Sequence, residues 1–149
     1  MSSDPRESPK VPISLKRWFF LHFLLDILFA LPLLLAPVPF LNLLGWEAVD
    51  PVAARLVAAA LFGIGIESLL ARKAPLSSFP ALLDLKLIWS TAALIGLLVS
   101  ILEGVHGIPW TLWGLVVIFG AFNLLWGWWR RRVSQLLGGN DGQEKERTL

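Results

Sequence analysis

Four long stretches of this sequence carry almost no charge. Between Trp18 and Phe40 the only Asp, Glu, Lys or Arg is Asp26, and between Glu103 and Arg130 there is none. A helix needs about 20 mainly apolar residues to cross the hydrocarbon core of a bilayer. The sequence therefore predicts an all-α fold, a transmembrane four-helix bundle with short loops and a short interfacial segment after the first helix. The helices are expected at about residues 14–36, 51–72, 80–103 and 109–131.

The composition supports a membrane protein and excludes several kinds of cysteine chemistry. Of the 149 residues, 56% are hydrophobic and 16% are charged, whereas soluble domains carry about 45–50% and about 25%. Four helices use most of these residues and leave no room among them for a separate catalytic domain. The chain has no cysteine, so disulfides, thiolate nucleophiles, iron–sulfur clusters and c-type haem attachment are excluded.

Proline and polar residues set the expected limits of the helices. Pro37 and Pro39 should end the first helix, and the following FLNLLGW is too short to cross the bilayer, so it is expected at the interface. Asp50 followed by Pro51 is typical of a helix N-terminus. The segments that flank the helices are polar and are expected to be disordered. The chain then divides into a cytoplasmic tail at 1–13, a transmembrane domain at 14–133 and a second cytoplasmic tail at 134–149.

Basic residues lie on one side of the predicted membrane. They precede the first helix, fill the loop between the second and third helices, and follow the fourth: Lys16, Arg17, Arg72, Lys73, Arg130, Arg131 and Arg132. Because basic residues stay on the cytoplasmic side, both termini are expected to be cytoplasmic in a multi-pass protein of the cell membrane. The basic charge is thus explained by topology, and we expect no nucleic-acid binding.

A few ionisable residues remain inside the predicted spans. His22 and Asp26 are four residues apart on one helix face, and Asp26 near the bilayer centre must be protonated, hydrated or paired. Helix direction and depth place further polar residues of the other three helices at similar levels. Within the resulting inner-half cluster, Lys86 can neutralise Glu67 or Asp26. The candidate ligand-binding or proton-relay residues are His22, Asp26, Glu67, Lys86, Ser90 and Asn123.

Two interpretations of this cluster stay open, together with a second polar group at the other end. The cluster could be an ion-pair and hydrogen-bond network that holds the helices in register, or a cavity in which Glu67 and Asp26 bind a polar ligand head or relay protons. A third possibility is that its members face a partner subunit or extend to the membrane surface. An outer group is expected to join Arg55 with Asp50, Glu103 or Glu47.

The histidines and tryptophans give little indication of a metal, haem or catalytic site. His22 and His106 are predicted on opposite sides of the membrane, too far apart to ligate one haem iron, and no metal-ligand spacing or nucleophile-base arrangement is present. We therefore predict no metal site and no catalytic residue, and the sequence identifies no cofactor. The tryptophans at both ends of the fourth helix are typical of interfacial anchors, with a lipophilic pocket as the alternative. Gly63 and Gly65 look like packing glycines.

Three segments resemble the small four-helix DoxX-like membrane proteins. They are LLLAPVPFLNLLGW after the first helix, ARLVAAALFGIGIESLLARKA in the second, and LKLIWS early in the third. The resemblance covers most of residues 15–130 and rests on a proline and glycine around the first outer loop and an arginine that begins the second helix. It implies a polar set of Arg55, Glu67, Lys86 and Ser90. Some DoxX-like proteins are linked to quinone-coupled oxidoreductase complexes, and their activities vary.

The sequence thus favours a non-enzymatic, multi-pass membrane protein, either an accessory subunit or a binder of a lipophilic small molecule such as a quinone or a lipid. The alternatives are a small proton-coupled transporter that works as a homodimer through Asp26 or Glu67, and a membrane subunit of a quinone-linked oxidoreductase. Expected partners are membrane lipids and either further copies of the chain or a larger membrane complex.

Overall fold

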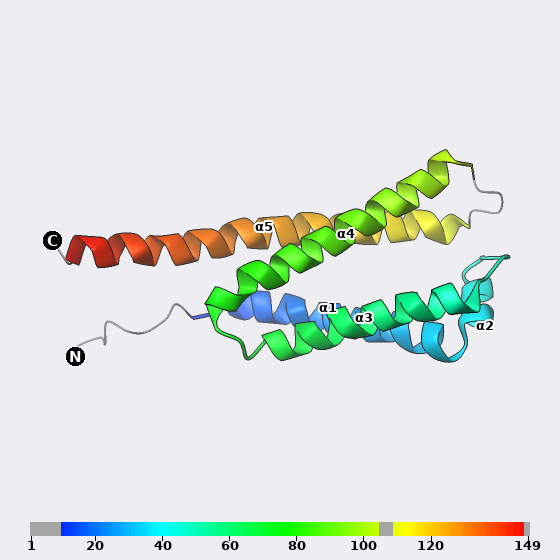
Figure 1. The fold of residues 1–149 in the computed structure, drawn as a ribbon, viewed down its shortest axis with the longest axis horizontal. Coiled ribbons are helices and arrows are strands. Elements are labelled where there is room, and N and C mark those ends of the chain that lie inside the picture. Colours follow the sequence, from blue (N-terminus) through cyan, green and yellow to red (C-terminus); the bar gives the residue numbers. More distant parts are fainter. Residues whose placement is uncertain (1–9, 105–108, 148–149) are drawn as a thin grey trace.

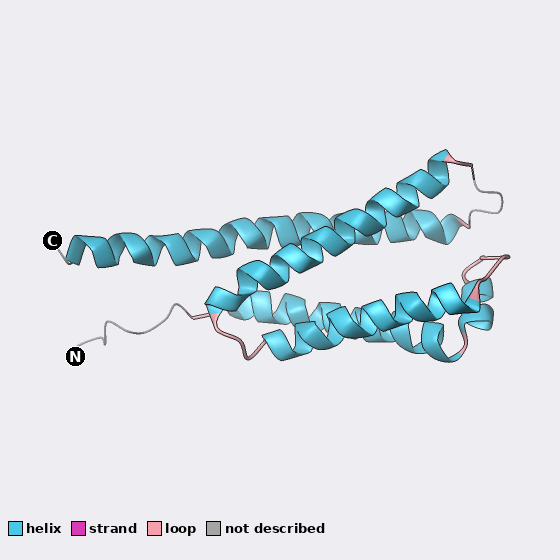
Figure 2. Cartoon of the chain, in the orientation of Figure 1, coloured by secondary structure: helices cyan, strands magenta, loops and turns pink. Residues whose placement is uncertain are grey.

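The described residues fold into four long helices and one short one. The computed structural model describes residues 10–104 and 109–147, and side chains as far as residue 139. The described residues contain no strand (Figures 1 and 2), which confirms the predicted all-α class. The expected loop around His106 lies outside the described residues. The elements are α1 (Ile13–Leu35), α2 (Pro37–Leu43), α3 (Pro51–Ala71), the 3-10 turn η1 (Leu76–Ser78), α4 (Phe79–Leu102) and α5 (Trp110–Arg147).

Four of these helices are long and apolar enough to cross a membrane. Their first residues, and the last residues of α1, α3 and α4, fall within a residue of the predicted ranges. Consecutive long helices run in opposite directions, so α1 begins and α5 ends at the same end of the molecule (Figure 1). We call this the basic end, because Lys16, Arg17, Arg72 and Lys73 lie there. The candidate spans are Ile13–Leu35, Pro51–Ala71, Leu76–Leu102 and Trp110–Gly139.

Prolines and caps explain where α1 ends and α3 begins. Pro37 has no backbone N–H to continue α1, and it begins the short helix α2, which lies where the sequence predicts a short segment after the first helix. Gly45 then turns the chain with a positive φ of 89°, a conformation that favours glycine. Asp50 caps α3 by accepting hydrogen bonds from the N–H groups of Val52 and Ala53 at 2.8 and 3.2 Å. The chain therefore returns antiparallel to α1.

The helices pack as two pairs, α1 with α3 and α4 with α5. The larger apolar core lies toward the basic end, where aromatic rings of three helices meet: Phe19 of α1, Phe79 of α4 and Trp126 of α5. A smaller core of Leu33, Ala54 and Ala58 lies between α1 and α3 toward the other end. The two pairs are thus joined mainly near the basic end, and the ribbon of α4 diverges from α3 toward the opposite end (Figure 1).

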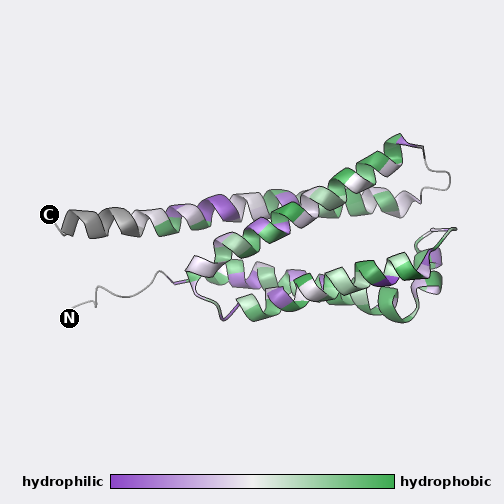
Figure 3. Ribbon diagram, viewed as in Figure 1, coloured by the Kyte–Doolittle hydropathy of each residue, from purple (hydrophilic) through white to green (hydrophobic). Residues whose placement is uncertain are grey.

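Much of the apolar surface faces outward. Only 28% and 22% of the apolar windows of α1 and α3, and 11% of those of α4 and α5, are buried inside the chain. Figure 3 shows hydrophobic residues along most of the length of these helices. In water such a surface would drive association, whereas lipid tails are as apolar as the leucines that they cover. The exposed faces therefore agree with a multi-pass membrane protein.

The end of α5 corrects one expectation. Residues 134–149 were predicted to form a disordered tail, but the helix continues to Arg147. Gly138 and Gly139 each cost about 1 kcal/mol relative to alanine, yet propagating an existing helix is far easier than nucleating a new one. At about 1.5 Å per residue, the 38 residues of α5 are longer than the bilayer core is thick. The last turns of α5 therefore extend beyond the apolar span.

Candidate functional site

A buried group of ionic and hydroxyl side chains lies next to the larger apolar core. On α1, the buried residues Phe19, His22 and Asp26 follow one another at intervals of three or four. This spacing puts all three on one face of α1, which is turned toward the other helices. The Nδ1 atom of His22 lies 3.0 Å from Oδ2 of Asp26. The predicted contact between histidine and carboxylate is therefore present in the structure.

A second ion pair joins α3 to α4. Nζ of Lys86 donates a hydrogen bond to Oε2 of Glu67 at 3.0 Å and another to Oγ of Ser68 at 2.5 Å. Lys86 is 1% exposed, which is unusual for a lysine. Rings of Phe19 and Trp126 lie 4.8 and 5.6 Å from Nζ, where their faces attract a cation. The ammonium group is thus held by one carboxylate, one hydroxyl and two aromatic rings.

Ser68 connects the two pairs and was missing from the sequence prediction. Its Oγ donates to the main-chain oxygen of Ile64 at 2.7 Å and lies 3.5 Å from Nδ1 of His22. We call His22, Asp26, Glu67, Ser68 and Lys86 the ionic network. A serine within a helix commonly bonds the carbonyl four residues earlier, so the residue type alone gave no signal. Its position beside Glu67 was the available indication.

Ser68→Ala should weaken the ionic network without removing a charge. Lys86 would lose one of its two hydrogen bonds, and we expect the free energy of unfolding in detergent to fall by about 1 kcal/mol. Ser100→Ala is the matched control, because Ser100 Oγ donates only to the Gly96 carbonyl of its own helix. Denaturant titration monitored by tryptophan fluorescence measures both variants. Equal stability of the two would show that Ser68 contributes nothing to the network.

The remaining two candidate residues form a neighbouring group. The amide nitrogen of Asn123 on α5 donates to Oγ of Ser90 at 2.9 Å and to Oγ1 of Thr91 at 2.8 Å on α4. We call these three residues the amide cluster. Ser90 follows Lys86 by one helical turn, so the amide cluster lies next to the ionic network. No hydrogen bond or ion pair joins the two groups in the described residues. Four of the six predicted residues thus belong to the ionic network, and the other two belong to the adjacent amide cluster.

Aromatic rings enclose the ionic network on the α5 side. The ring of His22 meets those of Phe122 and Trp126 edge to face, with centroids 4.9 and 5.3 Å away. Trp126 is 1% exposed, so it packs in the core and is no interfacial anchor. By contrast, Trp110, Trp113 and Trp128 are exposed. The tryptophans of α5 therefore have two structural roles: Trp126 packs in the core, and the exposed ones keep the predicted role of interfacial anchors.

The ionisable side chains of the ionic network lie in two contact pairs. Glu67 faces Lys86, and Asp26 faces His22. Two carboxylate oxygens, Asp26 Oδ2 and Glu67 Oε1, are buried without a hydrogen-bond partner in the described residues, Oδ2 having only the close ion contact with His22. Such atoms can accept a proton or a hydrogen bond. No group of three His, Asp or Glu side chains within 10–104 and 109–139 is placed to hold a metal ion.

The predicted outer ion pairs are replaced by main-chain contacts. Nε of Arg55 donates to the carbonyl oxygen of Leu34 at 3.2 Å, at the end of α1. Carbonyls in the last turn of a helix lack partners, and a cationic side chain satisfies one of them. Asp50 is used as the cap of α3, and Glu103 follows the last residue of α4. In the part of the chain that the structure describes, Arg55 forms no ion pair with either acid.

An ion pair at the basic end was missed in the sequence. Arg130 of α5 contacts both carboxylate oxygens of Asp84 on α4, at 2.6 and 3.2 Å, and its Nη1 donates to Ser134. Arg130 was interpreted only as one of the basic residues that set the topology. Because this pair is partly exposed, its contribution to stability is modest, about 0–1 kcal/mol. It fixes how α4 and α5 are aligned at this end.

Comparison with protein-family models, with curated proteins and with solved structures found no match. Function is therefore inferred from the residues of this chain, and the resemblance to DoxX-like proteins remains a prediction.

Proposed function

We propose that this protein is a non-enzymatic, multi-pass membrane protein that acts as an accessory subunit or binds a lipophilic small molecule. The observation that carries the proposal is the internal pairing of the ionic network. Lys86 is matched by Glu67, and His22 by Asp26. A binding site for a charged solute would need a charge that the protein leaves free. Much of the surface that the spans leave exposed is apolar.

The apolar outer faces support a partner of the same character. Exposed aliphatic side chains continue along α4 and α5, including Ile95, Leu98, Val117 and Ile118. Association in a bilayer depends on packing between such faces and on lipid entropy. A transmembrane helix of another protein or a lipophilic molecule meets these requirements. The ionic network holds the helices in register behind this surface.

The two partners can be separated by one experiment. The protein is extracted with its surrounding native lipids in polymer nanodiscs and then released into the gas phase for native mass spectrometry. An additional protein mass supports an accessory subunit, and an additional small mass, such as that of a quinone, supports a binder. The bare chain with ordinary phospholipids only would contradict both forms of the proposal.

A second candidate function is proton-coupled transport by a homodimer. The observation that favours it is the pair of buried oxygens that have no hydrogen bond in the described residues, Asp26 Oδ2 and Glu67 Oε1, either of which can accept a proton. An ionisable residue inside a span is a reasonable relay, because its insertion is costly.

Proton flux tests the second candidate directly. Protein reconstituted in liposomes with a trapped pH-sensitive dye is exposed to a pH step in the presence of a potassium diffusion potential. We expect the wild type to leak no faster than empty liposomes. A flux that Glu67→Gln or Asp26→Asn abolishes would contradict the non-transporting proposal and support the transporter.

We also propose that the basic end faces the cytoplasm, in the cell membrane, because basic residues concentrate there. A reporter attached after residue 149 and another inserted at residue 104 should then report opposite sides, the first cytoplasmic. Alkaline phosphatase and green fluorescent protein fusions measure this. Both reporters on one side would refute four spans, and opposite sides with the first one external would refute only the orientation.

A further inference from the structure

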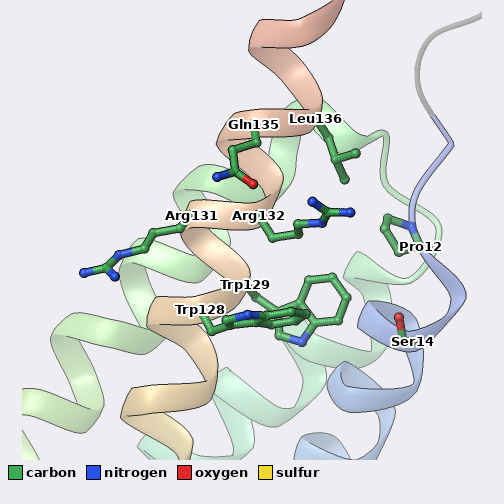
Figure 4. Close-up of a pocket in the computed structure, with 8 residues that line it drawn as sticks. All are labelled: Pro12, Ser14, Trp128, Trp129, Arg131, Arg132, Gln135 and Leu136. Atoms are coloured by element: carbon green, nitrogen blue, oxygen red, sulfur yellow. The ribbon is translucent and has the colours of Figure 1, made fainter.

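A pocket at the basic end is separate from the ionic network. Its volume is about 540 Å³, and it lies between the start of α1 and residues 128–136 of α5. Figure 4 shows Arg132 extending toward Pro12, above the indole rings and near Ser14. The pocket is lined by Pro12, Ser14, Trp128, Trp129, Arg131, Arg132, Gln135 and Leu136.

The pocket carries positive charge that the described residues do not neutralise. Arg130, the first of three consecutive arginines, is paired with Asp84. Arg131 and Arg132 form no ion pair in the described part of the chain, and none of the eight lining residues is acidic. A guanidinium group presents N–H donors in a planar fork that matches the oxygens of a phosphate. The charge pattern therefore favours an anionic ligand.

Uncharged groups around the arginines suit a ligand with an apolar part. Trp128 and Trp129 are adjacent indoles at the boundary of the span, where tryptophan prefers to lie. Trp129 is 3% exposed, and its Nε1 has no hydrogen-bond partner in the described residues. A buried indole N–H without a partner is unusual, because such donors are normally satisfied. Ser14 and Gln135 add polar groups beside the arginines.

We propose that this pocket binds the phosphate group of an anionic amphiphile, with Arg132 as the principal contact and the indole rings against the apolar part. The volume is in the range of pockets that hold small organic molecules, about 300–1,000 Å³, and is larger than a lone phosphate ion needs. A phospholipid headgroup and its glycerol fit this description. A soluble phosphate ester shares the same chemistry. The proposal requires a chain in a membrane and is independent of whether it is an accessory subunit or a binder.

Lipid retention tests the site in the full chain. The protein is reconstituted in nanodiscs of phosphatidylcholine with a minor fraction of phosphatidylglycerol, transferred to mild detergent, and examined by native mass spectrometry. The wild type should retain phosphatidylglycerol in preference to phosphatidylcholine. Arg132→Gln should lower this preference about tenfold, because one charge-assisted hydrogen-bond contact is lost. Arg132→Lys, which keeps the charge without the fork, should fall between the two.

Arg17→Gln is the matched control, because Arg17 is an exposed arginine at the same end that does not line the pocket. Retention that falls only in the Arg132 variants supports the site. Equal retention in Arg132→Gln and Arg17→Gln, whether both are high or both are reduced, overturns it. Sodium phosphate is then added to the wild type, with sodium chloride at the same ionic strength beside it. If sodium phosphate displaces the phosphatidylglycerol and sodium chloride does not, the ligand is assigned as a soluble phosphate. If neither salt displaces the lipid, the ligand is assigned as the lipid headgroup.

Discussion

Lys86→Met should lower the free energy of unfolding by about 3 kcal/mol, the low end of the range for removing one partner of a buried ion pair. Methionine fills a similar space among the rings of Phe19 and Trp126, so the loss is chiefly electrostatic. The substitution leaves the charged Glu67 without its cation and removes the hydrogen-bond donor to Ser68. The side chain of Glu67 is 22% exposed, so the protein does not fully enclose it, and we expect no larger effect.

Reversible unfolding of the detergent-solubilised protein measures this loss, with circular dichroism and tryptophan fluorescence as independent signals. Lys73→Met is the matched control: it removes the same charge from an exposed position at the same end of the bundle. The control should keep wild-type stability. If Lys86→Met were as stable as Lys73→Met, the buried pair would not hold α3 against α4.

Gly65→Ala should destabilise the protein by about 1–3 kcal/mol through overpacking between α1 and α3. A Cβ atom at Gly65 would lie 2.9 Å from Cβ of Asp26 and 3.4 Å from its Oδ2. The Asp26 Cβ is fixed to the backbone of α1 and cannot turn away, so the helices must separate. The contact between Asp26 and His22 should change with them. The same unfolding titration measures the loss.

Gly63→Ala is the comparison within the same helix. A Cβ atom there meets nothing within 4 Å, so the substitution should be neutral, or stabilising by as much as about 1 kcal/mol through helix propensity. Both glycines were predicted to be packing residues, and only Gly65 lies at a close approach. Equal stability of the two alanine variants would contradict the tight contact between α1 and α3 at Gly65.

Most of the helical frame could be predicted from the sequence. Long apolar runs, the missing N–H of Pro37 and the capping side chain of Asp50 act over a few residues, so their effect can be derived locally. The pairing of Lys86 with Glu67 was also accessible, because depth in the membrane follows from counting residues along helices of known direction. The desolvation cost of two opposite charges at one level favours their contact.

Contacts that depend on helix rotation and close packing could not be predicted in this way. Ser68 joins the ionic network because α1 and α3 approach closely at Gly65, and residue type gives no sign of that. Arg55 satisfies a carbonyl at the end of α1, a partner that no charge pattern reveals. The length of α5 was underestimated because the polar composition of residues 134–149 was interpreted as disorder, whereas an existing helix extends more easily than a new one begins.

A double-mutant cycle between Glu67 and Lys86 tests the central claim most directly. The stabilities of the wild type, Glu67→Gln, Lys86→Met and the double variant are measured in the same detergent, and the coupling energy is obtained from the four values. We expect the double variant to be more stable than Lys86→Met, because both charges are removed together, with a coupling of about 1–3 kcal/mol. Additive losses, with no coupling, would contradict the internal neutralisation on which the proposed function rests.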